Sequence, residues 1–135
     1  MTNQELISYA EEAKEHAYVP YSHFRVGAAL LCKDGTVYEG CNIENASFGA
    51  TNCAERTAFF KAVFDGHRDF EAIAIVGNHT GSPEEFCWPC GICRQVMLEF
   101  CQYDFRLIFH NENGDVREYT LKELFPLGFS QENLE

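Results

Sequence analysis

The chain has 135 residues, the length of one ordinary domain, so we predict a single domain over 1–135. Hydrophobic residues make up 46% and charged residues 23%, proportions typical of globular proteins and unlike those of disordered chains. No apolar run is long enough to cross a membrane, and the polar, acidic N-terminus lacks the pattern of a secretory signal. The net charge of −11 argues against nucleic acid and acidic membrane surfaces as partners.

The cysteines are the most informative residues of this composition. Seven is a high count for this length, and an odd one, whereas a secreted disulfide framework favours an even number. Clustered thiols in a reducing compartment more often bind metal or take part in chemistry. We therefore expect a cytoplasmic protein whose cysteines include functional residues.

The first half of the chain predicts a helix, two strands and a second helix, over 2–18, 25–32, 36–41 and 53–64. Thr2 and Glu5 fit a capping box at the start of the first helix, and Pro20 ends it. Asp34 and Gly35 form the turn between the two strands.

The second half predicts a strand, a helix and two further strands, over 71–77, 90–101, 105–110 and 115–119. Pro89 suits the first turn of that helix. Thr120 and Glu123 fit the cap of a last short helix. The β-α-β-α-β order in the middle predicts parallel strands with right-handed crossovers. An α/β fold follows, with a mixed sheet of about five strands covered by helices.

Three cysteines and one glutamate form a pattern suited to metal chemistry. Cys90 and Cys93 lie at the start of one predicted helix, where both sulfurs can face one point, and Cys53 opens another helix. Three protein ligands with an open fourth position are typical of catalytic zinc sites. Glu55 follows in the same helical turn as Cys53, so its carboxylate can move protons at the metal without being a ligand. Nucleobase deaminases carry a zinc ligand, one residue, a glutamate and then Pro-Cys-x-x-Cys.

The chain resembles the small, homotetrameric cytidine deaminase family in the blocks CAER (53–56), PCGICRQV (89–96), NIENAS (42–47), YSHFRVGAAL (21–30) and ELFPLGF (123–129). The resemblance covers nearly the whole chain. It implies a three-layer α/β/α fold with a mixed five-stranded sheet. It also implies zinc-dependent deamination of cytidine and 2'-deoxycytidine to uridine and 2'-deoxyuridine plus ammonia, in pyrimidine salvage.

The resemblance assigns roles at the metal. Cys53, Cys90 and Cys93 would hold one Zn²⁺ per chain, and Glu55 would be the proton shuttle. Arg56 resembles the family arginine that hydrogen-bonds the thiolates. Three thiolates leave a zinc site with a charge of −1, and a guanidinium would withdraw charge from sulfur and restore the acidity of the metal.

The resemblance also assigns substrate contacts. Asn42 and Glu44 resemble the pair that binds the ribose hydroxyls, and the Ala54 backbone would meet the edge of the base. Phe24 would flank the pyrimidine ring. The remaining two expected contacts are aromatic: Phe48, near the ribose at a position where tyrosine is common, and Phe129, which would close the pocket of a neighbouring subunit.

Other interpretations of the cysteine pattern remain open at this point. A Cys-x-x-Cys pair can be a redox site. Cys87 could add a fourth thiolate and close the zinc site, giving a structural interaction module instead of an enzyme. It also begins a Cys-x-x-Cys-x-x-Cys run typical of iron–sulfur proteins, although Met97 stands where the next cysteine would fall. A deaminase of another amino-heterocycle, such as blasticidin or a nucleotide, is the enzymatic alternative.

The remaining cysteines and the histidines carry no comparable pattern. We expect Cys32, Cys41 and Cys101 to be inert core residues. The histidines show no ligand spacing, and we expect them to be surface or packing residues. One further departure from the family is Trp88, which stands before Pro89 where a small polar residue is usual.

Overall fold

The computed structural model describes residues 1–135 and contains one five-stranded mixed sheet with the order β2-β1-β3-β4-β5. The strands are β1 (Phe24–Cys32), β2 (Val37–Cys41), β3 (Phe70–His79), β4 (Arg106–His110) and β5 (Val116–Thr120). β3 and β4 pair in parallel, and all other neighbours are antiparallel. The expected parallel direction of β2, β3 and β4 is therefore present, but β1 lies between β2 and β3, so only β3 and β4 pair as parallel neighbours.

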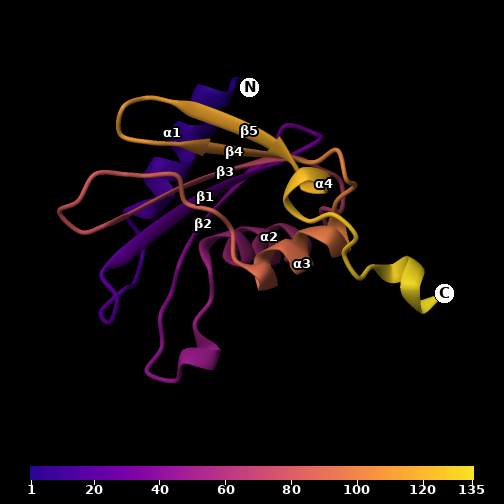
Figure 1. Cartoon of the computed structure of the whole chain (residues 1–135), viewed down its shortest axis with the longest axis horizontal. Coiled ribbons are helices and arrows are strands. Elements are labelled where there is room, and N and C mark those ends of the chain that lie inside the picture. The colour runs from indigo at the N-terminus through magenta and orange to yellow at the C-terminus, as the bar shows by residue number, and fades with distance from the viewer.

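Helices cover both faces of the sheet and give a three-layer α/β/α arrangement, with α1 on one face and α2 and α3 on the other (Figure 1). The helices are α1 (Asn3–Lys14), α2 (Ala54–Phe64), α3 (Gly91–Phe100) and α4 (Leu121–Leu124). Two short 3-10 turns were not expected, at Phe48–Ala50 and Gln131–Leu134. None of the helices combines the length and the apolar character that crossing a bilayer requires.

The first helix begins as predicted but ends earlier. The Thr2 hydroxyl accepts a hydrogen bond from the Glu5 amide, and the Glu5 carboxylate accepts one from the Thr2 amide, which is the predicted capping box. The prediction that the helix continues to residue 18 is wrong, because α1 ends at Lys14. The chain beyond it turns to pair with the segment after β2, where the Tyr18 amide donates to the Asn42 carbonyl.

Strand β1 is buried on both faces, which explains its continuous apolar run. Ala29 and Leu31 pack in the cluster under α1, whereas Ala28 and Leu30 pack in the larger cluster under α2 and α3. Because side chains alternate along a strand, one strand supplies both cores. The sheet therefore separates the α1 side from the side that carries the cysteine-bearing helices.

Two glycines allow the helices to lie directly on the sheet. A Cβ added to Gly27 would lie 2.1 Å from the Ala10 carbonyl oxygen of α1, and one added to Gly40 would lie 2.3 Å from the Ala54 carbonyl oxygen of α2. No side chain larger than hydrogen fits such a contact. Gly40 therefore sets how closely the first turn of α2 approaches the sheet.

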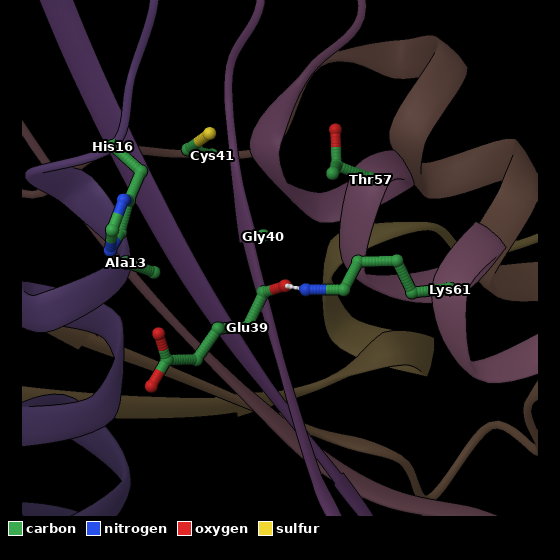
Figure 2. Close-up of a pocket in the computed structure, with 7 residues that line it drawn as sticks. All are labelled: Ala13, His16, Glu39, Gly40, Cys41, Thr57 and Lys61. Atoms are coloured by element: carbon green, nitrogen blue, oxygen red, sulfur yellow. Dashed lines mark hydrogen bonds between the residues drawn. The ribbon is translucent and has the colours of Figure 1, made fainter.

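One edge of the sheet is formed by β2, and a side chain of α2 partly covers this edge. The Lys61 ammonium donates a hydrogen bond to the Glu39 carbonyl, across a cavity of about 270 Å³ between α1, β2 and α2 (Figure 2). A lysine on an edge strand's backbone blocks pairing with a further strand. This cavity contains none of the predicted site residues; His16, Cys41 and Thr57 also line it.

Helix α3 begins at Gly91, one residue later than predicted. Cys90 is the N-cap and Gly91 the first helical residue, so Pro89 precedes the helix and does not lie in its first turn as predicted. The Pro89 carbonyl instead accepts a hydrogen bond from the Arg94 Nε at 2.9 Å. The same guanidinium donates to the Leu124 carbonyl of α4, which ties α3 to the C-terminal part of the chain.

The close contact at Gly40 leads to a test of the packing. Replacing Gly40 by alanine should lower the free energy of unfolding in urea by about 1–3 kcal/mol, because the new methyl group overlaps the α2 backbone. Gly49→Ala is the matched control, since nothing lies within 4 Å of its added Cβ. Equal stability of the two variants would show that α2 does not rest on Gly40.

Candidate metal centre and active site

Three sulfurs from two helix starts converge at one point. The Sγ atoms of Cys53 and Cys90 are 3.7 Å apart and those of Cys90 and Cys93 are 3.5 Å apart. All three lie within 4.8 Å of one another. Zn–S bonds of about 2.3 Å in a tetrahedron place sulfurs roughly 3.8 Å apart. The cluster therefore fits three corners of a zinc site, contributed by segments that lie far apart in the sequence.

The backbone at these positions leaves the sulfurs free to bind metal. Cys53 is the N-cap of α2 and Cys90 the N-cap of α3; both have extended backbone, and neither side chain makes a capping hydrogen bond. Cys93 lies in the first turn of α3. The positive ends of both helix dipoles face the cluster and favour thiolate over thiol.

Charge at the Cys53 sulfur is stabilised by its immediate neighbours, whereas the hydrogen bond to Cys53 and burial raise the pKa of Cys93. A hydrogen bond from the Cys93 thiol, together with the Arg56 guanidinium, lowers the pKa of Cys53 to about 5. The Arg56 Nη2 lies 3.3 Å from the Cys53 sulfur. Three thiolates around a zinc dication would carry a net charge of −1, which this guanidinium offsets. The donor set and its surroundings thus suit zinc.

Glu55 is placed beside the sulfurs without belonging to their cluster. It is the second residue of α2, and only 5% of its surface is exposed. Burial raises the pKa of its carboxyl to about 7, because the charged form loses its hydration. A carboxyl that titrates near neutrality can both accept and donate a proton at the working pH.

Cys87 does not join the three sulfurs. Its Sγ packs against the backbone at Gly77, where an added Cβ would lie 3.1 Å from it, and burial raises its pKa to about 12. The cluster therefore holds three thiols and leaves a fourth corner open, unlike a closed structural site. Burial likewise raises the pKa of Cys32, Cys41 and Cys101. Cys32 and Cys101 are buried in the core as predicted, but the prediction is wrong for Cys41, which is only half-buried and lines the cavity beside β2.

Two of the predicted base contacts lie next to this centre. Ala54 is fully buried between Cys53 and Glu55 at the start of α2. Phe24 begins β1, and its ring is beside Gly77, the residue that also contacts Cys87. The His79 ring meets the Phe24 ring edge-on, with centroids 4.8 Å apart.

The two predicted ribose-binding residues are held in fixed orientations. The Asn42 side chain accepts from the Val26 amide at 2.9 Å and donates to the Phe24 carbonyl at 2.8 Å. The Glu44 carboxylate accepts hydrogen bonds from the Tyr21 and Ser22 amides. Asn42 keeps one N–H, and Glu44 keeps lone pairs, for a ligand.

Three residues that support the site were not singled out from the sequence. The Ser22 hydroxyl donates to Glu44 and, with the backbone contacts, lowers the pKa of that carboxyl. The Thr57 hydroxyl donates to the Cys53 carbonyl, and Arg94 holds the Pro89 carbonyl. Ser22 and Arg94 lie inside blocks that carry the family resemblance, but their hydrogen bonds depend on folded geometry.

Phe48 and Phe129 are both exposed in the isolated chain. Phe48 is in a 3-10 turn with 79% of its surface exposed, and its nearest aromatic partner is Tyr21, at 6.5 Å between centroids. Phe129 follows α4 in the C-terminal segment, which extends away from the sheet (Figure 1). Neither ring is covered by the rest of the chain.

Comparison with known proteins agrees with this geometry. Residues 1–109 match the family described as the cytidine and deoxycytidylate deaminase zinc-binding region. The chain is 52% identical to the cytidine deaminase of Sporosarcina psychrophila, covering 99% of this chain and 96% of that protein. It is 54% identical to that of Halalkalibacterium halodurans, covering 99% and 98%.

A solved structure extends the agreement to the fold. The crystal structure of cytidine deaminase from Burkholderia pseudomallei superimposes with a TM-score of 0.87 at 50% identity, over 96% of this chain and all of that one. With its three converging thiols and adjacent buried glutamate, this chain belongs to the zinc-binding cytidine and deoxycytidylate deaminase family.

Proposed function

We propose that this chain, as one catalytic domain over 1–135, hydrolyses cytidine and 2'-deoxycytidine to uridine and 2'-deoxyuridine with release of ammonia. The observation that carries the proposal is the open three-thiol cluster with the buried carboxyl of Glu55 beside it. Full-length relatives named as cytidine deaminases support this substrate class. A free nucleoside also suits a chain with a net charge of −11, which would repel a polyanion. We place the reaction in pyrimidine salvage in the cytoplasm.

The proposed reaction depends on Glu55 moving protons. Zinc held by Cys53, Cys90 and Cys93 would lower the pKa of a water molecule and so supply a nucleophile near neutral pH. Glu55 accepts a proton from the attacking water and gives it to the ring nitrogen next to the reacting carbon. It then carries the second water proton to the amino group. The C–N bond breaks, ammonia leaves, and the carbon keeps the water oxygen as a carbonyl.

The remaining site residues would orient the nucleoside. We assign the ribose hydroxyls to Asn42 and Glu44, whose side chains are already held by backbone hydrogen bonds. Such preorganisation lowers the entropy lost on binding. Phe24 flanks the pyrimidine ring, and the Ala54 backbone meets its edge. The Glu44 carboxylate would repel a phosphate, which favours nucleosides over nucleotides.

We further propose a homotetramer with shared active sites. Phe48 and Phe129 are exposed in the isolated chain, as are Phe60, Phe64 and Leu127. Large apolar side chains left uncovered in this way are typical of interaction surfaces. In the assembly, Phe129 would close the pocket of a neighbouring subunit and Phe48 would lie near the ribose.

The role of Glu55 is tested by Glu55→Gln. The amide keeps the size of the side chain but cannot shuttle protons, so kcat with cytidine should fall by at least roughly 10²- to 10⁴-fold. Zinc content by atomic absorption should stay at the wild-type level. Glu132→Gln, in the exposed C-terminal turn, is the control and should retain full activity. Wild-type protein that holds zinc but leaves cytidine unchanged would refute the proposed function.

The number of sulfur ligands is tested by two serine variants. Cys90→Ser should release zinc at much lower chelator concentration than wild type, because one of three ligands is lost. Cys87→Ser should retain zinc as wild type does, since its sulfur lies outside the cluster. Equal release from both variants would instead indicate a closed four-thiolate site and a structural module.

The shared site is tested by Phe129→Ala. Loss of the ring should lower kcat/KM by roughly 10- to 100-fold, given about 1.5–3 kcal/mol for a buried aromatic side chain. Mixed assemblies of Phe129→Ala and Glu55→Gln subunits should regain activity, because some pockets then contain both intact residues. A dilute monomer with full activity, identified by light scattering, would contradict the shared site.

A further inference from the structure

Lys14 and Glu84 form a buried ion pair on the face of the sheet opposite the zinc ligands. Only three charged residues of the chain are buried: Glu55, Lys14 and Glu84, each with 5% of its surface exposed. The Lys14 Nζ lies 2.5 Å from Glu84 Oε2. The Glu11 carboxylate and the His110 imidazole complete the cluster, at 3.5 Å from Lys14 and 3.4 Å from Glu84.

Stability alone does not account for this pair. Removing an ammonium and a carboxylate from water is costly, and apolar side chains of similar volume in such positions are often equally or more stable. Burial and the neighbouring Glu84 carboxylate raise the pKa of Glu11 to about 7. Glu11 therefore holds its proton in part at neutral pH, which leaves Lys14 and Glu84 as the opposed charges. What the pair gives beyond stability is one fixed position for Glu84.

Glu84 is fixed through its backbone as well. Its amide donates to the Glu112 carboxylate at 3.1 Å, and its carbonyl accepts from the Glu112 amide at 2.9 Å. The segment between β3 and α3 is thus held in place by α1 on one side and by the chain after β4 on the other. It has no helix or strand of its own between His79 and Gly91.

The residues adjacent to Glu84 face a cavity at Phe24. Pro83, Glu85 and Phe86 line a space of about 390 Å³ together with Phe24 and His79. Cys87 follows and packs against Gly77 beside the Phe24 ring. The ion pair at Glu84 therefore fixes the segment that lines this cavity. The segment lies beside Phe24, the residue proposed to flank the pyrimidine ring, and continues along the chain to Cys90.

We propose that Lys14 and Glu84 are positioning residues for substrate binding: their buried ion pair holds residues 83–86 as a preformed wall of the nucleoside pocket. The inference rests on the proposed function for the identity of the substrate. The pair acts through the backbone of the segment and does not touch the reacting atoms. Its loss should weaken nucleoside binding while the metal ligands and Glu55 stay in place.

The test is the double variant Lys14→Met, Glu84→Leu, which replaces the ion pair by apolar groups. KM for cytidine should rise roughly 3- to 30-fold while kcat stays within about twofold of wild type. Zinc per chain should not change, and the melting temperature should not fall. Amides of residues 84–88 should exchange hydrogen faster than in wild type. Wild-type KM together with wild-type exchange would overturn the proposal.

The matched control is Arg106→Met, Glu71→Leu. This pair is partly exposed, with Nη2 and Oε2 3.4 Å apart, at the opposite end of β3 and β4. It should keep the wild-type KM. If the first double variant does not fold, Glu84→Gln is the test: this substitution keeps the shape of the side chain but removes its charge, so KM for cytidine should still rise. Lys14→Arg keeps the positive charge opposite Glu84, so its KM should stay near the wild-type value. An unchanged KM in Glu84→Gln would overturn the proposal.

The two proposals fail in different ways. If the wild type does not convert cytidine, the proposed function fails, and the hydrogen exchange of residues 84–88 still reports whether the ion pair positions the segment. If the wild type is active and the double variant matches it in KM and exchange, only the positioning role fails.

Discussion

The architecture of the site depends on bringing two helix N-termini to within bonding distance of one point. Each contributes a cysteine N-cap whose sulfur makes no capping hydrogen bond, and α3 adds a second sulfur one turn on. Three thiolates repel one another, so the arrangement requires compensating positive charge. The helix dipoles and Arg56 supply part of it, and a zinc dication would supply the rest. Gly40 makes the approach of α2 possible because it lets that helix lie directly on the sheet.

The sheet divides the buried charge of the molecule into two groups with different physical roles. On the α2 and α3 side, burial raises the pKa of Glu55 to about 7, which suits a group that must gain and lose a proton. On the α1 side, Lys14 and Glu84 neutralise each other and fix a segment of irregular structure. Burial tunes reactivity in the first case and gives a defined geometry in the second.

The isolated chain leaves part of its pocket unfinished. Ala54 lies between Cys53 and Glu55, and the Asn42 side chain donates to the Phe24 carbonyl, whereas Phe48 and Phe129 are exposed. Apolar rings at the tips of extended segments lose stabilising contacts unless another surface covers them. In our proposal, assembly of the subunits also completes the substrate pocket, because Phe48 and Phe129 would contact both a neighbouring subunit and the nucleoside.

Features that depend on near neighbours along the chain could be predicted from the amino-acid sequence. The capping box at Thr2, the strands of the β1–β2 hairpin and the pairing of Cys90 with Cys93 follow from spacings of two to four residues, because such contacts form within one turn or one hairpin. Which distant groups meet depends instead on the tertiary structure. It brought Cys53 to Cys90, left Cys87 out, ended α1 at Lys14 and placed Lys14 against Glu84. Packing of whole elements sets these contacts, and local periodicity carries no information about them.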